Sequence, residues 1–404
     1  MKVLLANKFF YRAGGAEAVM FQEREFLLSQ GIDVVEFSMQ DPRNEPSDYS
    51  ASFVANQNYT DSSQSMLSKA SSAVKFIHSF EAVENFRKLL VATKPDLVHC
   101  HNIYHQLTPS IIRAAKSLNT PVVLTLHDYK PICPVYNRLR KGIPCSDCRG
   151  GKFSNVLKNR CADDSLGRSA LMYAEATVQR LLGSYESIDR VIAPSQFMAD
   201  AVIGDRFTQE QTSVIYNAVD LPEPAAAESD STEEDYILFF GRLSAEKGIS
   251  TLMAAHAEMT DTKLVIAGTG PLEQQLHEQF PAAEYRGFVA GQALADTIRR
   301  AAIVVVPSQW YENCPMSVLE AMSHGRPVIG SRMGGIPELV TEGETGELFE
   351  AGNHTELKNK LVALMADSQR RVQYGEAAVA RVQSQFSMSV HNQKLLDLYE
   401  QVLN

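Results

Sequence analysis

The sequence predicts an α/β protein with two Rossmann-like domains, each built around a parallel sheet. Short apolar runs rich in Val, Ile and Leu alternate with helical patterns along the chain, as a strand–helix–strand architecture requires. Continuous apolar character of this kind is typical of parallel strands that are covered on both faces. The length of 404 residues favours two domains over one large core.

The first half is expected to form an N-terminal domain over residues 1–220. A helical pattern covers residues 66–93, and Lys94-Pro95-Asp96 then turns the chain into the next strand. Strands are expected at residues 2–5, 34–37, 97–99, 122–126, 191–193 and 214–216.

The second half repeats this alternation after a break at residues 221–235. The break holds two prolines, three alanines and a run of acids, a composition that builds no core and indicates a linker. A C-terminal domain is expected over residues 236–385, followed by a final helix in residues 386–404. Strands of this domain are expected at residues 236–240, 263–267, 285–288, 303–306 and 328–330.

Composition and charge exclude some classes of protein. The net charge of −10 argues against nucleic acid as the main partner. No run approaches the roughly 18 apolar residues of a membrane span. The apolar run at the N-terminus is too short for a signal peptide, because Asn7 and Lys8 interrupt it. We therefore expect a cytoplasmic protein.

One segment, residues 130–168, is basic within this acidic chain. It holds nine basic and only three acidic residues, a local net charge of +6. This pattern predicts docking on an anionic membrane surface or a lipid diphosphate, where each basic residue contributes about 1 kcal/mol. A solvated loop is the alternative. Apolar residues that could insert or pack are interleaved with the charges: Ile132, Tyr136, Leu139, Ile143, Phe153, Val156 and Leu157.

The same segment contains four cysteines with metal-ligand spacing. Cys133, Cys145, Cys148 and Cys161 form a C-x11-C-x2-C-x12-C pattern, which fits a closed four-thiolate zinc site. In a reducing compartment a metal is favoured over disulfides. A structural zinc ion would order an insertion that has little core of its own. Four unconnected thiols in a flexible loop are the alternative.

The most informative stretch is Trp310-Tyr311-Glu312-Asn313-Cys314-Pro315-Met316-Ser317-Val318-Leu319-Glu320. It follows an apolar run and leads into a helix, with Pro315 placed for the first helical turn. Ligands bind where loops leave the carboxyl ends of parallel strands, and helix N-termini attract phosphate. Glu312 and Glu320 flank this helix N-terminus, so the stretch suits a ligand with sugars on both sides of a diphosphate.

A second loop supplies cations for that diphosphate. Arg242 and Lys247 follow the strand that ends near Gly241, and Arg can grip two phosphate oxygens while Lys acts as a point charge. Such preorganised cations stabilise the charge that develops on a departing nucleotide. The sequence contains no D-x-D motif for a metal–diphosphate bridge. The glycines of residues 268–273 lack the third glycine of a dinucleotide fingerprint, so NAD is rejected.

The spacing of Glu312 and Glu320, E-x7-E, resembles that of the retaining glycosyltransferases of family 4, which have the GT-B fold. Residues 240–248 resemble the G-R-x4-K-G diphosphate clamp of that family. The resemblance covers nearly the whole chain, and it continues through residues 267–271, 286–288 and 334–338 and, near the N-terminus, 14–17 and 125–128.

The resemblance implies a GT-B fold, in which two Rossmann-like domains face a deep interdomain cleft and the last helix crosses back to the N-terminal domain. It implies retaining, metal-independent transfer of a sugar from a nucleotide-diphosphate sugar to a hydroxyl of a glycan or lipid-linked saccharide, as in surface polysaccharide synthesis. No cofactor is expected for catalysis. A uridine nucleotide is the first choice, because the loop of Arg286, Gly287 and Phe288 offers backbone groups that suit a pyrimidine; GDP-mannose remains open.

The resemblance also assigns roles to individual residues. Glu312 would contact the hydroxyls of the donor sugar and Glu320 those of the ribose, while His127 would lie near the reacting carbon. Where the family often has glycine and an aromatic residue, this chain has Asn313 and Cys314. The expected catalytic residues are His127, Glu312, Arg242 and Lys247. Donor contacts are expected from Gly14, Gly15, Gly241, Arg242, Lys247, Gly270, Gly287, Phe288, Glu312, Asn313, Cys314, Pro315, Met316, Ser317 and Glu320.

The N-terminal domain is expected to hold the acceptor through His101, His105 and Asp128, with packing as an alternative role for the two histidines. Gly14 and Gly15 would allow close backbone approach or positive φ. Two other functions share the fold: a sugar-nucleotide epimerase or phosphorylase, and a nucleotide-sugar-binding protein without turnover. The presence of Arg242 and Lys247 beside two acids argues against the last.

Overall fold

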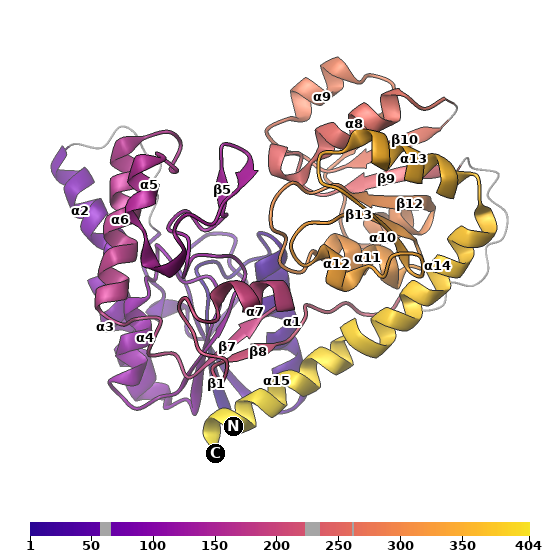
Figure 1. Cartoon of the computed structure of the whole chain (residues 1–404). Coiled ribbons are helices and arrows are strands. Elements are labelled where there is room, and N and C mark those ends of the chain that lie inside the picture. Colours follow the sequence, from indigo (N-terminus) through magenta and orange to yellow (C-terminus); the bar gives the residue numbers. More distant parts are fainter. Residues whose placement is uncertain (57–65, 223–234, 261) are drawn as a thin grey trace. The chain divides into compact units, whose positions relative to one another are not determined.

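The structure, a computed structural model, describes residues 1–56, 66–222, 235–260 and 262–404 (Figure 1). The chain divides into two units. Unit 1 comprises Met1–Arg138, Cys145–Ile215 and Asn392–Asn404, and unit 2 comprises Leu139–Pro144 and Tyr216–His391. The boundary after Ile215 precedes the predicted linker, and residues 223–234 of that linker lie outside the described residues.

Unit 1 contains a six-stranded sheet, all of it parallel, in the order β2-β1-β3-β4-β7-β8. The strand order changes direction between β1 and β3, so the loops that leave these two strands diverge at the carboxyl edge of the sheet. The last strand begins earlier than predicted, because pairing with β7 recruits the polar Thr212 and Ser213. The strands are β1 (Lys2–Ala6), β2 (Asp33–Phe37), β3 (Leu97–Cys100), β4 (Val122–Thr125), β7 (Arg190–Ala193) and β8 (Thr212–Val214).

The helices of unit 1 include one correction. The single helix predicted over residues 66–93 is two helices, because Ser79 interrupts it and its Oγ accepts a hydrogen bond from Ala82 N at 3.1 Å as the N-cap of the second. The helices are α1 (Gly15–Ser29), α2 (Met66–Ile77), α3 (Phe80–Thr93), α4 (Ser110–Lys116), α5 (Ser154–Lys158), α6 (Leu166–Leu181) and α7 (Gln196–Val202), with 3-10 turns η1 (Ser50–Ser52) and η2 (Arg149–Gly151).

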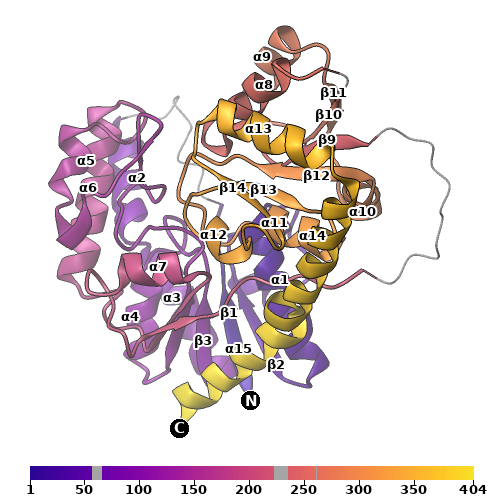
Figure 2. The same ribbon diagram turned by 45° about the vertical axis from the view of Figure 1, so that its right-hand side comes forward.

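The final helix, α15 (Met388–Leu403), packs mostly on unit 1 (Figure 2). Leu395, Leu398 and Tyr399 are buried in one cluster with Met20 and Phe21 of α1. Burying side chains of this size contributes about 1.5–3 kcal/mol each, so the contact is a substantial part of the unit 1 core. The Tyr399 hydroxyl also lies 2.7 Å from His99 Nδ1 at the end of β3.

Unit 2 contains the second six-stranded parallel sheet, in the order β11-β10-β9-β12-β13-β14. This is the doubly wound order in which the direction reverses between the first and fourth strands, here β9 and β12. The edge strand β14 was not predicted, because its sequence is short and half polar; pairing with β13 places it in the sheet. The strands are β9 (Tyr236–Phe240), β10 (Lys263–Ala267), β11 (Glu284–Gly287), β12 (Ala301–Val306), β13 (Val328–Ser331) and β14 (Gly346–Phe349).

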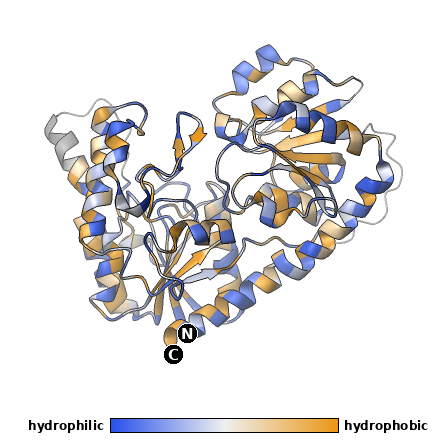
Figure 3. Cartoon of the chain, viewed as in Figure 1, coloured by the Kyte–Doolittle hydropathy of each residue, from blue (hydrophilic) through white to orange (hydrophobic). Residues whose placement is uncertain are grey.

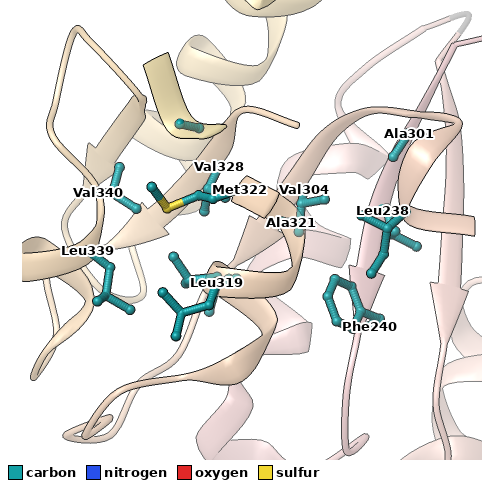
Figure 4. Packing of buried hydrophobic residues seen from close by; sticks show 14 of the residues in the cluster. Leu238, Phe240, Ala301, Val304, Leu319, Ala321, Met322, Val328, Leu339 and Val340 are labelled. Atoms are coloured by element: carbon teal, nitrogen blue, oxygen red, sulfur yellow. The ribbon is translucent and has the colours of Figure 1, made fainter. Parts of the chain in front are cut away.

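Helices cover both faces of this sheet, so successive strand residues enter different cores. Leu238 and Val304 pack with Leu319 and Met322 of α11 (Figure 4), whereas Ile237 packs on the opposite face. Figure 3 shows these strands as largely hydrophobic, as burial on both faces requires. The helices are α8 (Ile249–Ala257), α9 (Glu273–Gln279), α10 (Gly291–Arg299), α11 (Met316–Ser323), α12 (Ile336–Leu339), α13 (His354–Met365) and α14 (Ser368–Arg381), with η3 (Ala245–Lys247) and the π-helical η4 (Val382–Phe386).

A small antiparallel pair, β5 (Leu139–Arg140) and β6 (Ile143–Pro144), was also not predicted. It lies in the basic segment, where no apolar run announces a strand. In the described part of the chain, no helix has the length and apolarity needed to cross a membrane.

Candidate active site

Two loops meet at the point of unit 2 where the strand order reverses. One follows β9 and carries Arg242 and Lys247, and the other follows β12 and carries Glu312. Gln309 N donates a hydrogen bond to Glu246 O at 2.8 Å, which ties the loops together. Gly248 has φ +69°, and a Cβ there would lie 1.8 Å from Pro307 O. Only glycine allows this close approach, so Gly248 is required for the contact between the two loops.

Glu312 is the centre of this contact. Its Oε1 accepts hydrogen bonds from Lys247 Nζ at 2.7 Å and from Ser308 Oγ at 2.6 Å, and its side chain is only 6% exposed. Burial alone would raise the pKa of this carboxyl. The charge of Lys247 and the two hydrogen bonds outweigh burial, and the pKa lies below its ordinary value. Glu312 is therefore an ionised, fixed hydrogen-bond acceptor at neutral pH.

The backbone of Glu312 is held as firmly as its side chain. Gly335 N donates to Glu312 O at 2.7 Å. Gly334 has φ +60°, and a Cβ there would lie 2.1 Å from the same carbonyl oxygen. Ser308 is a supporting residue that the sequence reasoning missed, although its place directly after β12 and Pro307 was the available signal.

Helix α11 begins directly after this loop. Pro315 is its N-cap, with φ −68° and ψ 120°, and not part of the first turn as predicted; Met316 and Ser317 open the helix. No side chain caps α11, so its first N–H groups can receive an anion. Asn217 Nδ2 donates to Cys314 O at 2.9 Å and fixes the approach to the helix; sequence reasoning also missed this residue.

Glu320 lies in the second turn of α11, on the same helix as the open N-terminus. Burial raises the pKa of its carboxyl to about 7. Such a carboxyl is only partly ionised near neutral pH, and it can accept a hydrogen bond from a ligand hydroxyl.

The other predicted donor residues of unit 2 lie along the same edge of the sheet. Gly241 N donates to Ala267 O at 3.0 Å, and Gly268 N donates to Gly287 O at 2.6 Å, so the ends of β9, β10 and β11 are tied. The loop that contains Gly270 lies on the same edge, where Leu272 N donates a hydrogen bond to Leu243 O at 3.0 Å.

Three side chains near this edge differ in accessibility. Arg242 is exposed, and Phe288 is 78% exposed. Arg286 is instead held by Glu284, with its Nε 2.6 Å from Glu284 Oε1. Arg242 and Phe288 can therefore meet a ligand, whereas the guanidinium of Arg286 stabilises strand β11.

Unit 1 has a small cavity of about 10 Å³, roughly the space of one water molecule, at the carboxyl ends of β3 and β4. His101, His127 and Asp128 line it together with Lys130 and Tyr104. The structure thus brings together His127 and two of the three side chains predicted to hold the acceptor, His101 and Asp128. His101 Nδ1 lies 2.9 Å from His127 Nε2.

A buried acid stands behind this histidine pair. Glu23 Oε2 of α1 lies 3.5 Å from His101 Nε2 and 3.4 Å from His99 Nδ1. A carboxylate beside Nε2 favours a proton on that nitrogen, so His101 Nδ1 accepts from His127 Nε2–H. His127 Nδ1 is then an acceptor. Sequence reasoning missed Glu23, although an acid on the apolar face of a helix was a signal.

Glu23, His99 and His101 are, within the described residues, the one group of three side chains whose potential metal ligands lie within 4.8 Å of one another. Both ring nitrogens of His99 already have partners, Tyr399 OH at 2.7 Å and Thr125 Oγ1 at 2.8 Å. This arrangement is a hydrogen-bond network that links β3, β4 and α15.

Burial sets the charges of the two cavity residues after β4. It lowers the pKa of His127 to about 4, with smaller contributions from Glu23, His99 and Lys8. It raises the pKa of Asp128 to about 6, against the lowering effect of the hydrogen bond from Lys130 N at 2.9 Å. At neutral pH the cavity therefore holds a neutral imidazole beside an ionised carboxylate, which can orient hydroxyl groups.

For two predictions in unit 1, the structure favours one of the alternatives left open by the sequence. His105 does not line the cavity; its ring stacks on Phe76 with 3.7 Å between ring centroids, so the alternative of packing holds. Gly14 does not need positive φ, since it is the extended N-cap of α1 with φ −176°, and Gly15 has no positive φ either. A Cβ on Gly14 would make only an ordinary contact, at 3.7 Å with Glu17.

The basic segment is better ordered than the docking hypothesis assumed. Lys130 is buried, 2.6 Å from Glu175 Oε2, and cannot reach a membrane surface. Among the interleaved apolar residues, Ile132, Phe153 and Val156 are buried in unit 1, so they pack and do not insert. Arg149, Lys152, Lys158 and Arg160 are exposed, as are Tyr136 and Ile143.

Two protein-family models match the sequence. Residues 13–223 match the model of Glycosyltransferase Family 4, and residues 234–367 match that of Glycosyl transferases group 1. A sulfoquinovosyl transferase of Arabidopsis thaliana is 27% identical over 306 residues, which are 70% of this chain and 52% of the plant protein. This chain thus spans about half the length of that relative.

Solved structures show the same fold. Sucrose-phosphate synthase from Thermosynechococcus elongatus superposes with a TM-score of 0.71 at 20% identity, covering 100% of this chain and 99% of that one. An Anabaena protein in complex with UDP and glucose gives a TM-score of 0.67 at 19% identity, covering 99% and 100%. At such identities the likeness shows the fold alone.

The two doubly wound units and these structural neighbours define a GT-B protein, which confirms the predicted fold class. The family models together span most of the sequence. The chain belongs to the group 1, family 4 glycosyltransferases.

Proposed function

We propose that this protein transfers a sugar from a UDP-sugar to a hydroxyl of a glycan or lipid-linked saccharide, with retention of configuration and without a catalytic metal, in surface polysaccharide synthesis. The observation that carries the proposal is the Lys247–Glu312 pair at 2.7 Å, beside the uncapped N-terminus of α11. It puts a cation for phosphate, an acceptor for sugar hydroxyls and an anion-binding helix end in one place.

The proposed chemistry is the front-face substitution that the family resemblance implies. The bond between the anomeric carbon and the phosphate oxygen breaks, and the acceptor oxygen forms a bond to that carbon on the same face. The departing phosphate takes the acceptor's proton. Arg242, Lys247 and the N–H groups of α11 stabilise the negative charge that develops on this phosphate. Glu312 positions the sugar, and Glu320 positions the ribose.

Metal independence is supported by the residues themselves. The described part of unit 2 has no group of three side chains with metal-ligand spacing. Arg242 and Lys247, in the loop that follows β9, can supply the positive charge that a metal would otherwise bring to a diphosphate. Uridine is supported by the Anabaena structure with UDP and by the exposed loop at Phe288.

The first experiment measures nucleotide release from UDP-, GDP- and ADP-sugars without acceptor, with and without EDTA. We expect slow, EDTA-resistant release of UDP from one UDP-sugar, because a preorganised site hydrolyses its donor when water replaces the acceptor. Release of GDP alone would overturn the choice of base. Loss of turnover in EDTA would overturn metal independence, and a new nucleotide sugar in place of free nucleotide would favour the epimerase.

We place the acceptor at the residues that line the unit 1 cavity. We also propose that the exposed basic residues between Arg149 and Arg160, a stretch without acids, dock the protein on the membrane that carries the acceptor. Four basic residues near an anionic surface contribute about 1 kcal/mol each at low salt. We therefore expect co-sedimentation with anionic but not with zwitterionic vesicles. Replacing Arg149, Lys152, Lys158 and Arg160 by glutamine should abolish it, and equal sedimentation of this variant would contradict the assignment.

A further inference from the structure

The four cysteines of residues 133–161 all lie in unit 1, on the turns of one short segment. Cys133 precedes β5, Cys145 directly follows β6, Cys148 is the N-cap of η2, and Cys161 follows α5. All four are described by the structure, and none forms a disulfide. Proposed sugar transfer uses none of them.

Two of the sulfurs occupy the same kind of turn. Asp147 N donates to Cys145 Sγ at 3.5 Å, and Val135 N donates to the sulfur of Cys133, in each case from two residues further along the chain. Arg138 N is a second donor to Cys133. Backbone N–H groups that point at a sulfur can serve as the outer hydrogen bonds of a metal-bound thiolate.

The four thiols also share one electrostatic neighbourhood. The charges of Cys133, Cys161 and Cys145 all act on Cys148, so the four sulfurs lie close enough to interact electrostatically. Each thiolate therefore disfavours the others. A divalent cation between them reverses this effect, because it stabilises every thiolate at once.

The backbone of the segment is unusually constrained. Of the nine non-glycine residues with positive φ in the described chain, six lie between residues 136 and 164: Tyr136, Arg138, Lys141, Arg160, Asp163 and Asp164. Such conformations are uncommon and persist only where surrounding contacts fix them. A metal ion that joins the turns would supply this constraint in a segment with few buried side chains.

We propose that Cys133, Cys145, Cys148 and Cys161 bind one structural zinc ion. The C-x2-C at the centre, the paired N–H···S turns and the gathering of four thiols in one segment carry this inference. No three of these sulfurs lie mutually within 4.8 Å, whereas four thiolates on one zinc ion stand roughly 3.8 Å apart. Zinc binding by all four cysteines therefore requires that the turns bring the sulfurs closer together than they lie in this structure. Zinc is chosen because soft thiolates in a tetrahedral set select it.

The test is metal analysis of the full-length protein, purified after expression with added zinc. We expect ~1 zinc per chain in the wild type, and below ~0.2 in Cys145→Ser and Cys148→Ser. Cys100→Ala removes a buried cysteine of β3 outside the segment and should retain ~1 zinc per chain.

Cobalt replacement keeps the proposal testable if the serine variants do not fold. The wild-type protein, stripped of zinc and titrated with Co²⁺, should show thiolate-to-metal charge-transfer bands and tetrahedral d–d bands, and a fall in Tm should follow zinc removal. Less than ~0.2 zinc in the wild type together with no cobalt–thiolate bands would overturn the site. Disulfides among these four cysteines, found by mass spectrometry of the alkylated protein as purified, would overturn it as well.

Discussion

Glu312→Gln is expected to lower the rate of sugar transfer by about 10²–10³-fold, because it removes a fixed, charged acceptor at the reacting sugar. Glutamine keeps the volume of the side chain, and its Oε1 can still accept from Ser308. It cannot pair with the charge of Lys247, now 2.7 Å from Glu312 Oε1. We expect unfolding free energy to fall by only about 1–2 kcal/mol, because Lys247 is 28% exposed and water can solvate it.

The measurement is initial transfer rate at saturating donor, with circular dichroism and Tm to verify folding. The matched control is Glu376→Gln, an exposed acid of α14 in the same unit, which should transfer at the wild-type rate. Full activity in Glu312→Gln would refute the placement of the donor sugar at this residue.

A double-mutant cycle with Lys247→Met separates two roles of the pair. If Lys247 served only to hold Glu312, the double variant would be no slower than Glu312→Gln. We expect it to be slower still, since in the proposed mechanism Lys247 also contacts the leaving diphosphate. The affinity for UDP should fall in Lys247→Met and change little in Glu312→Gln, because only the lysine carries charge complementary to phosphate.

The meeting of the loops that follow β9 and β12 could be predicted from the sequence, because each loop is recognisable locally. A strand, a polar loop and a helix follow one another in residues 301–323, and the strand-order rule then places the loop at the ligand-binding edge. The clamp of Arg242 and Lys247 follows another strand in the same way. Each of these side chains lies within a few residues of a recognisable apolar run.

The supporting residues could not be predicted because they depend on packing between distant segments. Glu23 reaches His101 from α1, and Tyr399 reaches His99 across 300 residues of sequence. Nothing in the spacing of residues 97–105 distinguishes His101, which enters the cavity, from His105, which stacks on Phe76. The end of β3 directs His101, whereas contact with Phe76 of α2 directs His105.

The same limit applies to the basic segment. Charge and apolar residues in residues 130–168 predicted docking and left open whether the apolar side chains insert or pack; α5 and α6 bury Phe153 and Val156, and Glu175 of α6 holds Lys130. An alternating pattern of basic and apolar residues does not tell whether the apolar side chains face lipid or a neighbouring helix. Only the fold of the insertion decides this.

Glu320→Gln should stabilise the protein at pH 8 while weakening donor binding. Burial raises the pKa of this carboxyl from 4.5 to about 7, so the folded state binds the proton more tightly than the unfolded state does. Stability from this group is present below about pH 4.5 and is lost as pH rises through about 7. The shift corresponds to at most about 3 kcal/mol, and partial exposure of the side chain reduces this to about 1–2 kcal/mol.

Glutamine has no charge to bury, so the variant should gain about 1–2 kcal/mol in urea unfolding at pH 8, and this gain should shrink markedly at about pH 5.5. An equal gain at both pH values would show that packing, and not ionisation, is responsible. The KM for donor should rise about tenfold at pH 8, the loss of one charged hydrogen bond to the ribose. Stability and donor affinity thus change in opposite directions, as expected for a carboxylate that is costly to bury and is kept for its ligand.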